Sequence, residues 1–185
     1  MSYTQENNVH EGSRSPWGKI DFIDHIATGI DAVSTPGHGG LKLSAERNRV
    51  VHPAWRAAGG WYEEDCEYGI VTFTFPDDFP AGHAEGVAMR WFPDEYEIVT
   101  GRYVLPGQSY VRDEQIFHQN HANDLIGVSA IGVEDDMVKV AVQRGGRRGP
   151  STDQRVFLVP KDDYHARSNH GFILDPTLYE ELADW

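Results

Sequence analysis

The first hydrophobic segments of the chain are short and follow the two-residue period of β-strands. Residues 20–26 alternate in part, and residues 30–34 and 41–43 are rich in apolar and β-branched side chains. A Thr-Gly pair separates the first two segments, and the glycine-rich loop 35–40 precedes the third. We therefore expect three strands near the N-terminus that follow one another as a β-meander.

After this meander the pattern becomes helical. Ser44 is a residue type favoured at a helix N-cap, so a helix is expected to begin at residues 45–47. The segment 61–75 is ambiguous, because its acidic residues 63–67 suit the first turn of a helix, whereas residues 70–75 have the β-branched and aromatic composition of a strand. We expect a helix at the start of this segment.

The rest of the chain arranges helices and strands in separate blocks. Residues 83–100 are expected to form two helices around Pro93, and residues 113–120 a third. The strands expected towards the C-terminus are 125–133, 137–142 and 155–159. Asp175 and Pro176 supply a cap and a first helical residue, so a last short helix should begin there. Separate blocks favour the α+β class, with an N-terminal β-meander, a helical acidic middle, and C-terminal antiparallel strands with a short terminal helix.

The length and apolar content of the chain fit one folded domain. The chain has 185 residues, 39% of them hydrophobic, and we expect a single α+β domain over residues 15–185 preceded by a flexible arm at residues 1–14. No apolar run approaches the length of a membrane span, and Cys66 has no partner for an intrachain disulfide. These features predict a protein of the reducing cytoplasm, with no membrane partner.

Negative charge is concentrated in one part of the chain. Residues 57–138 hold 16 Asp and Glu against three Arg, which accounts for the whole formal charge of −13. Such a surface attracts a basic partner and repels nucleic acid, so we expect a basic protein as partner and no direct nucleic-acid binding. The residues assigned to this binding surface are Asp77, Asp78, Asp94, Glu95, Glu97, Glu134, Asp135 and Asp136. An acidic surface that serves only solubility is the alternative.

The first candidate site combines His38 with the acidic residues Glu63, Glu64 and Asp65. His38 lies in a loop where Gly39 and Gly40 allow the backbone to approach a ligand closely. Carboxylates near an imidazole suit either a divalent metal or general acid–base catalysis. In the competing interpretation the acids favour a helix N-terminus and His38 caps a turn.

A second candidate metal set is Glu114, His118 and His121. The spacings of four and three residues place these side chains on one face of a helix, and two imidazoles with a carboxylate suit a first-row metal. The set lacks the His-Glu-x-x-His order of zinc proteases, and a solvated polar face is the alternative.

Two further features of the sequence indicate a functional site less strongly. Cys66 stands among Glu64, Asp65 and Glu67, whose negative charges disfavour the thiolate that a nucleophilic cysteine needs. Arg144, Arg147 and Arg148 form the only basic cluster of the sequence, which suits a phosphate or an acidic partner, or simply the solvated tip of a hairpin. No phosphate-binding P-loop or dinucleotide-type glycine pattern is present in the sequence.

Five strings of the sequence form a recognisable set: SPWG at 15–18, STPGHGGL at 34–41, GWYEEDCE at 60–67, FLVP at 157–160 and GFILDP at 171–176. Taken together they resemble an uncharacterised domain family found in bacteriophage, plasmid and bacterial accessory genes. The resemblance implies a mobile-element setting and one domain over most of the chain. It supplies no established activity and no catalytic residues.

Two functions from different classes, and a weaker third, follow from these observations. The first is an accessory protein that acts by binding a basic surface of a host protein, such as a defence or nucleic-acid-handling factor, and the sequence favours this over an enzyme. The alternative is a metal-assisted hydrolase, which uses His38 with the acidic cluster and a divalent metal as cofactor. A virion or assembly component is the third. Salt-dependent binding supports the first, and a stoichiometric metal supports the second.

Overall fold

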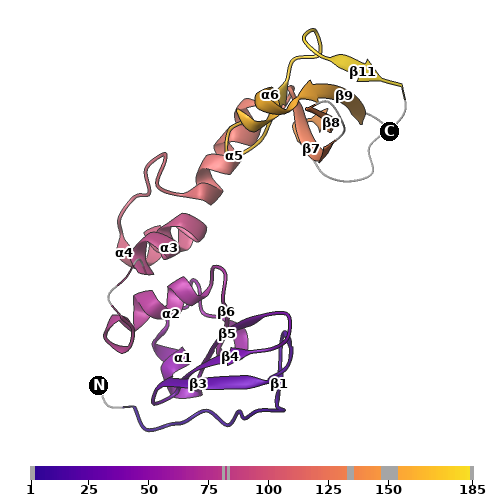
Figure 1. Ribbon diagram of the computed structural model, residues 1–185. Coiled ribbons are helices and arrows are strands. Elements are labelled where there is room, and N and C mark those ends of the chain that lie inside the picture. The colour runs from indigo at the N-terminus through magenta and orange to yellow at the C-terminus, as the bar shows by residue number, and fades with distance from the viewer. Residues whose placement is uncertain (1–2, 81, 83, 133–135, 147–153, 184–185) are drawn as a thin grey trace. The chain divides into compact units, whose positions relative to one another are not determined.

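The structure is a computed structural model that describes residues 3–80, 82, 84–132, 136–146 and 154–183 (Figure 1). It divides into two compact units, Met1–Val111 and Arg112–Trp185. Each unit is described by itself, and the single domain expected over residues 15–185 stays a prediction. None of the helices in the described part of the chain has the length and apolar character needed to cross a bilayer.

The first unit is built on antiparallel strands. A two-stranded hairpin pairs β1 (Arg14–Ser15) with β2 (Gly18–Lys19). A four-stranded sheet follows in the order β3-β4-β5-β6. Its strands are β3 (Phe22–Ala27), β4 (Ile30–Ser34), β5 (Gly39–Leu43) and β6 (Trp61–Glu63). The expected N-terminal β-meander is therefore confirmed, and the sheet gains a fourth strand.

Helix α1 (Ala45–Val50) follows β5 directly. The Ser44 hydroxyl accepts a hydrogen bond from the backbone N–H of Arg47 at 3.3 Å, which confirms the expected N-cap. A short 3-10 turn, η1 (Ala58–Gly60), then leads into β6. Tyr62 of β6 is buried, and its hydroxyl donates to Asn48 Oδ1 at 2.6 Å, which ties the fourth strand to α1.

The segment 61–75 differs from the expectation. Residues Trp61–Glu63 form a strand, residues 64–67 form a turn, and helix α2 begins only at Tyr68 and ends at Thr74. The acidic residues thus precede the helix, and the strand-like residues lie inside it. Ile70 and Val71 are buried in the core of the unit, so burial of one helix face outweighs their β-propensity.

The remaining helices of the first unit confirm the expected break at Pro93. After η2 (Pro76–Asp78), helix α3 covers Ala84–Trp91 and helix α4 covers Pro93–Thr100. Pro93 stands at the first position of α4, where its missing N–H is not needed.

Residues 3–14, expected as a flexible arm, contact the sheet and α1. The backbone N–H groups of Thr4 and Gln5 each donate to Glu46 Oε2 at 3.0 Å. The Asn7 side chain donates to Asp31 Oδ2 and to the Lys42 carbonyl, both at 2.9 Å. These bonds give the segment defined partners in the first unit.

The second unit contains a five-stranded antiparallel sheet in the order β10-β7-β8-β9-β11. Its strands are β7 (Leu125–Gly132), β8 (Met137–Arg144), β9 (Arg155–Pro160), β10 (Ile173–Leu174) and β11 (Glu180–Leu182). Helix α5 (Tyr110–Asn120) precedes the sheet and spans the boundary between the units. The three expected C-terminal strands and the helix at 113–120 are confirmed.

The last helix lies earlier than expected. Helix α6 covers Lys161–His165, whereas residues 175–178 form a turn. The Asp175 carboxylate accepts hydrogen bonds from the backbone N–H and the hydroxyl of Thr177, so it caps a turn and not a helix. With this shift the α+β class is confirmed, and its strands and helices occur in the expected blocks.

Candidate functional site

The loop that carries His38 connects β4 to β5. Hydrogen bonds between Thr35 and His38 close it. The Thr35 hydroxyl donates to the His38 carbonyl at 2.8 Å and accepts from the His38 backbone N–H at 3.2 Å. The backbone N–H of Thr35 also donates to the His38 carbonyl at 2.8 Å. A Ser-Thr-Pro-Gly-His sequence thus folds into a tight turn that fixes the position of the imidazole.

Strand pairing brings the acidic segment to this loop. Gly40 of β5 pairs with Glu63 of β6, so the end of β6 lies beside the start of β5. The backbone N–H of Glu64 then donates to the Gly39 carbonyl at 3.2 Å. Within the turn that follows, Glu63 Oε2 accepts from Cys66 N at 3.2 Å and Glu67 Oε2 accepts from Glu63 N at 3.0 Å. Glu67 and one oxygen of Glu63 are therefore occupied in shaping the turn.

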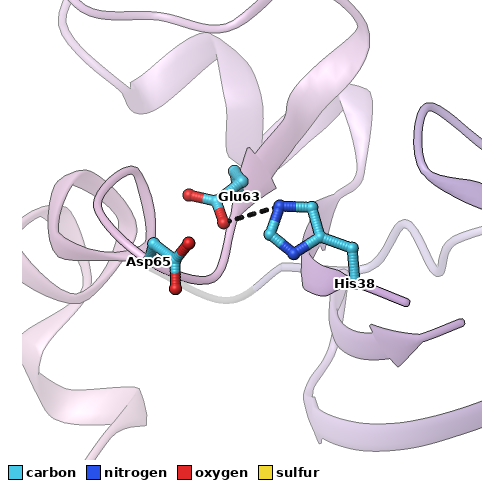
Figure 2. Close-up of side chains that lie close together, drawn as sticks. All are labelled: His38, Glu63 and Asp65. Atoms are coloured by element: carbon cyan, nitrogen blue, oxygen red, sulfur yellow. Dashed lines mark ion pairs between the residues drawn. The ribbon is translucent and has the colours of Figure 1, made fainter. Parts of the chain in front are cut away.

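The imidazole of His38 lies between two carboxylates. Its Nε2 is 3.0 Å from Glu63 Oε1, and its Nδ1 is 3.0 Å from Glu64 Oε1. Asp65 completes the group, since one donor atom each from His38, Glu63 and Asp65 lie within 4.8 Å of one another. Figure 2 shows Glu63 and Asp65 on the same side of the ring. The structure thus brings together all four residues of the first candidate site.

His38 and Glu63 are close enough to form an ion pair (Figure 2), but the contact lacks the geometry of a hydrogen bond. Glu63 Oε1 is buried and has no hydrogen-bond partner among the described residues, although His38 Nε2 lies only 3.0 Å away. Two ligands that each lie about 2.1 Å from one ion are roughly 3.0 Å apart at a right angle and roughly 3.4 Å apart in a tetrahedron. A separation of 3.0 Å therefore suits two ligands of one cation as well as an ion pair between an imidazolium and a carboxylate.

Two glycines and a tryptophan surround this group, and sequence reasoning assigned no role to the tryptophan. A Cβ on Gly39 would lie 2.5 Å from Glu64 Oε2, and one on Gly40 would lie 2.4 Å from the Trp17 ring. Trp17 packs edge-on against His38 with ring centroids 6.0 Å apart. Trp17 lies in the tight turn between β1 and β2, where its backbone N–H donates to Ser15 Oγ at 3.2 Å. The SPWG string was the signal that marked it.

A cavity adjoins the group within the first unit. Its volume is about 700 Å³, and Glu64 and Gly40 form part of its wall. Most of the remaining wall is apolar, with contributions from Leu41, Tyr68 and Phe79. Sequence reasoning did not find this cavity, because its walls come from segments that only the folded sheet and helices bring together.

Cys66 is next to the cluster and is poorly suited to nucleophilic attack. Burial raises the pKa of its thiol, and the charges of Glu63, Asp65 and Glu67 raise it further. This agrees with the effect expected from its acidic neighbours.

The second candidate metal set does not converge. Helix α5 ends at Asn120, and the backbone N–H of His121 still donates to the Phe117 carbonyl at 3.0 Å, yet Glu114, His118 and His121 form no group with metal-ligand spacing. His118 Nδ1 is hydrogen-bonded to the Gly145 carbonyl at 3.0 Å, and His121 Nδ1 to Asp124 Oδ2 at 2.7 Å. Across the ranges that the structure describes, the one His/Cys/Asp/Glu group with metal-ligand spacing is His38, Glu63 and Asp65.

The expected partner-binding residues are divided between internal contacts and the surface. Asp78 pairs with the buried Arg47 at 2.6 Å, Glu97 Oε1 accepts from Val104 N at 2.8 Å, and Asp136 pairs with Lys161 at 3.1 Å. Asp77 and Asp94 are exposed and Glu95 is half-buried, whereas Glu134 and Asp135 lie outside the described residues.

In the basic cluster, Arg144 Nη1 donates to the Asn123 carbonyl at 2.8 Å. Arg147 and Arg148 lie outside the described residues. The phosphate or acidic-partner role of this cluster stays a prediction.

The fold and the site define an α+β protein whose N-terminal unit carries a histidine–carboxylate group. The family model described as "Domain of unknown function (DUF7007)" matches residues 10–122, and the chain belongs to this family. The match contains His38 and the acidic cluster but ends before the strings at 157–160 and 171–176. The expectation of an uncharacterised domain family is confirmed. No curated protein and no solved structure shows significant similarity to the chain.

Proposed function

We propose that His38, Glu63 and Asp65 bind one divalent metal ion and that the protein is a metal-assisted hydrolase. The observation that carries the proposal is that one ligand atom each of His38, Glu63 and Asp65 lie within 4.8 Å of one another, with His38 Nε2 3.0 Å from the buried Glu63 Oε1. Two carboxylates balance the charge of a divalent cation. One imidazole and two carboxylates suit Zn²⁺ or Mn²⁺.

Each residue of the cluster has a separate role. His38 offers Nε2 as the ligand, and Glu64 holds the ring by accepting from Nδ1–H at 3.0 Å. A carboxylate on the second ring nitrogen fixes the tautomer and orientation of a ligating histidine. Three protein ligands leave a position open for water, and a bound divalent ion lowers the pKa of such a water so that it becomes a nucleophile.

The proposal is tested by metal titration. Isothermal titration with Zn²⁺ and Mn²⁺ should give one site per chain, and Asp65→Asn should weaken binding at least about tenfold, as expected for loss of a ligand. The matched control is Asp21→Asn, which removes an equally exposed carboxylate of the same unit that lies outside the cluster. Circular dichroism should be unchanged in both variants. A wild-type protein that binds neither ion, or equal affinity in both variants, refutes the proposal.

A second proposal is that the protein binds a basic host protein as a mobile-element accessory factor in the host cytoplasm. The support is the formal charge of −13 together with the exposed carboxylates Asp77 and Asp94. The family resemblance adds the phage and plasmid setting, from which a virion or assembly role also follows as a weaker proposal. Asp78 and Glu97 are engaged in contacts within the first unit, whereas Asp136 pairs with Lys161 but keeps 92% of its side chain exposed.

Salt dependence tests the second proposal. A partner captured from host lysate should be retained at about 50 mM salt and lost at about 500 mM, because charge attraction is screened over a shorter Debye length. The double variant Asp77→Asn/Asp94→Asn should capture less, and Asp21→Asn should capture the same amount. Capture that is indifferent to salt and to these variants refutes it.

A further inference from the structure

We infer that the cavity beside His38 holds an apolar group of the substrate that is neutral or positively charged. This inference rests on the proposed hydrolase function and adds a substrate class to it. It disfavours a negatively charged group inside the cavity, because Glu64 forms part of the wall.

The size and lining of the cavity indicate a small-molecule pocket. Its volume of about 700 Å³ lies within the range of roughly 300–1,000 Å³ that is usual for such sites. Leu41 comes from β5, Tyr68 from the start of α2, and Phe79 from the segment after η2. Side chains of this kind, with a few polar groups, bind the apolar part of a ligand and leave its polar part to be oriented by those groups.

Glu64 connects the cavity to the proposed metal centre. Its side chain forms part of the cavity wall, and its Oε1 is 3.0 Å from His38 Nδ1. Ser34 at the end of β4 and Gly40 in β5 also line the cavity, and they flank the loop that carries His38. A ligand in the cavity therefore lies next to the turn where the carboxylates are gathered.

The charged side chains in and next to the described part of the cavity wall are negative. Glu64 is in the wall, and Glu63 and Asp65 adjoin it in sequence, whereas the described residues of the lining include no lysine or arginine. The proposed cation balances Glu63 and Asp65, which leaves the Glu64 carboxylate as the charge in the wall, so an anionic group in the cavity would be repelled and a cationic group attracted. A neutral apolar group is accepted because most of the wall is apolar.

Three naphthalene probes of similar shape test whether the cavity prefers a cationic, a neutral or an anionic ligand. They are 2-naphthylmethylamine, which is cationic at neutral pH, 2-naphthylmethanol, which is neutral, and 2-naphthoate, which is anionic. Binding is followed on the full chain by NMR line broadening of the probe, without metal and with saturating Zn²⁺. In the metal-free protein we expect the amine and the alcohol to bind, with the carboxylate at least about tenfold weaker. In Glu64→Gln this difference should shrink.

A pair of substitutions in the wall tests the location. Thr72 of α2 lines the cavity, so Thr72→Phe should fill it and abolish binding of the amine and the alcohol. Thr72→Val keeps the volume of the residue and should bind both as wild type does. Circular dichroism shows whether Thr72→Phe folds, and if it does not, Thr72→Leu takes its place.

The outcomes separate this inference from the proposed function. If Zn²⁺ binds as one equivalent but no probe binds, or all three bind alike and Thr72→Phe has no effect, the inference is overturned while the metal centre stands. If the probes bind in the expected order but neither Zn²⁺ nor Mn²⁺ binds, the hydrolase is refuted, and the substrate assignment with it. If Zn²⁺ binds as one equivalent and the probes bind in the expected order, the metal centre and the substrate class are both supported.

Discussion

Replacement of Gly39 by alanine tests how tightly the site is built. The added Cβ would lie 2.5 Å from Glu64 Oε2 and 2.8 Å from the Val33 carbonyl. The carboxylate can rotate away, but the carbonyl belongs to β4 and cannot. Overpacking of this kind destabilises a protein by about 1–3 kcal/mol, which for a chain of this size lowers Tm by roughly 2–12 °C.

The same substitution should weaken metal binding. Because the Cβ displaces Glu64 from its position at His38 Nδ1, the ring loses its orienting partner, and loss of such a partner typically weakens metal affinity by about 10–100-fold. Thermal unfolding and zinc titration measure the two effects. Gly37→Ala is the matched control, since a Cβ there meets nothing within 4 Å and should leave both quantities unchanged. A Gly39→Ala protein that matches Gly37→Ala in both measurements refutes the reasoning.

Three further predictions concern titration and reactivity. Zinc affinity should fall as pH falls, because protons compete for His38, Glu63 and Asp65, and a pH-independent affinity contradicts the ligand assignment. The hydrogen bond to Asp31 raises the pKa of His25 above 6.5, so the stability it contributes is complete below pH 6.5 and is lost as pH rises through the raised value. Urea unfolding should therefore show His25→Gln to be more destabilising at pH 5.5 than at pH 8.5, and equal differences at the two pH values contradict this. Cys66 should react with a disulfide reagent more slowly than a free thiol at neutral pH and recover the free rate in urea, because burial raises its pKa, and an unprotected rate in the folded protein refutes this.

The sequence predicted most elements whose determinants are local. The strand Ile30–Ser34, the helix capped by Ser44 and the helix boundary at Pro93 all follow from side-chain period, capping chemistry or the missing proline N–H. The segment 61–75 was not predictable in this way. Its strand exists because Tyr62 pairs with Leu41, and its helix because Ile70 and Val71 face the core, which are both long-range effects.

For the candidate site, too, the sequence indicated the residues and the tertiary structure decided which of them come together. The sequence contained two histidine–carboxylate sets that could ligate a metal, one around His38 and one on α5. The pairing of Gly40 with Glu63 brings two segments together in the first set, whereas in the second His118 bonds to the Gly145 carbonyl and His121 to Asp124. Pattern alone placed the His38 set first but could not show which set converges, because strand register and the partners of each histidine are fixed by packing.

The sequence by itself determined the α+β class, the net charge of −13 and the residue types available for chemistry. The tertiary structure decided how those charges are used. It engages Asp78 with the buried Arg47, leaves Asp77 at the surface, and places Glu63 with one buried oxygen beside His38. The physical reason is that composition fixes how many charges a chain carries, whereas the energy of each charge depends on its burial and its partners, which only the fold supplies.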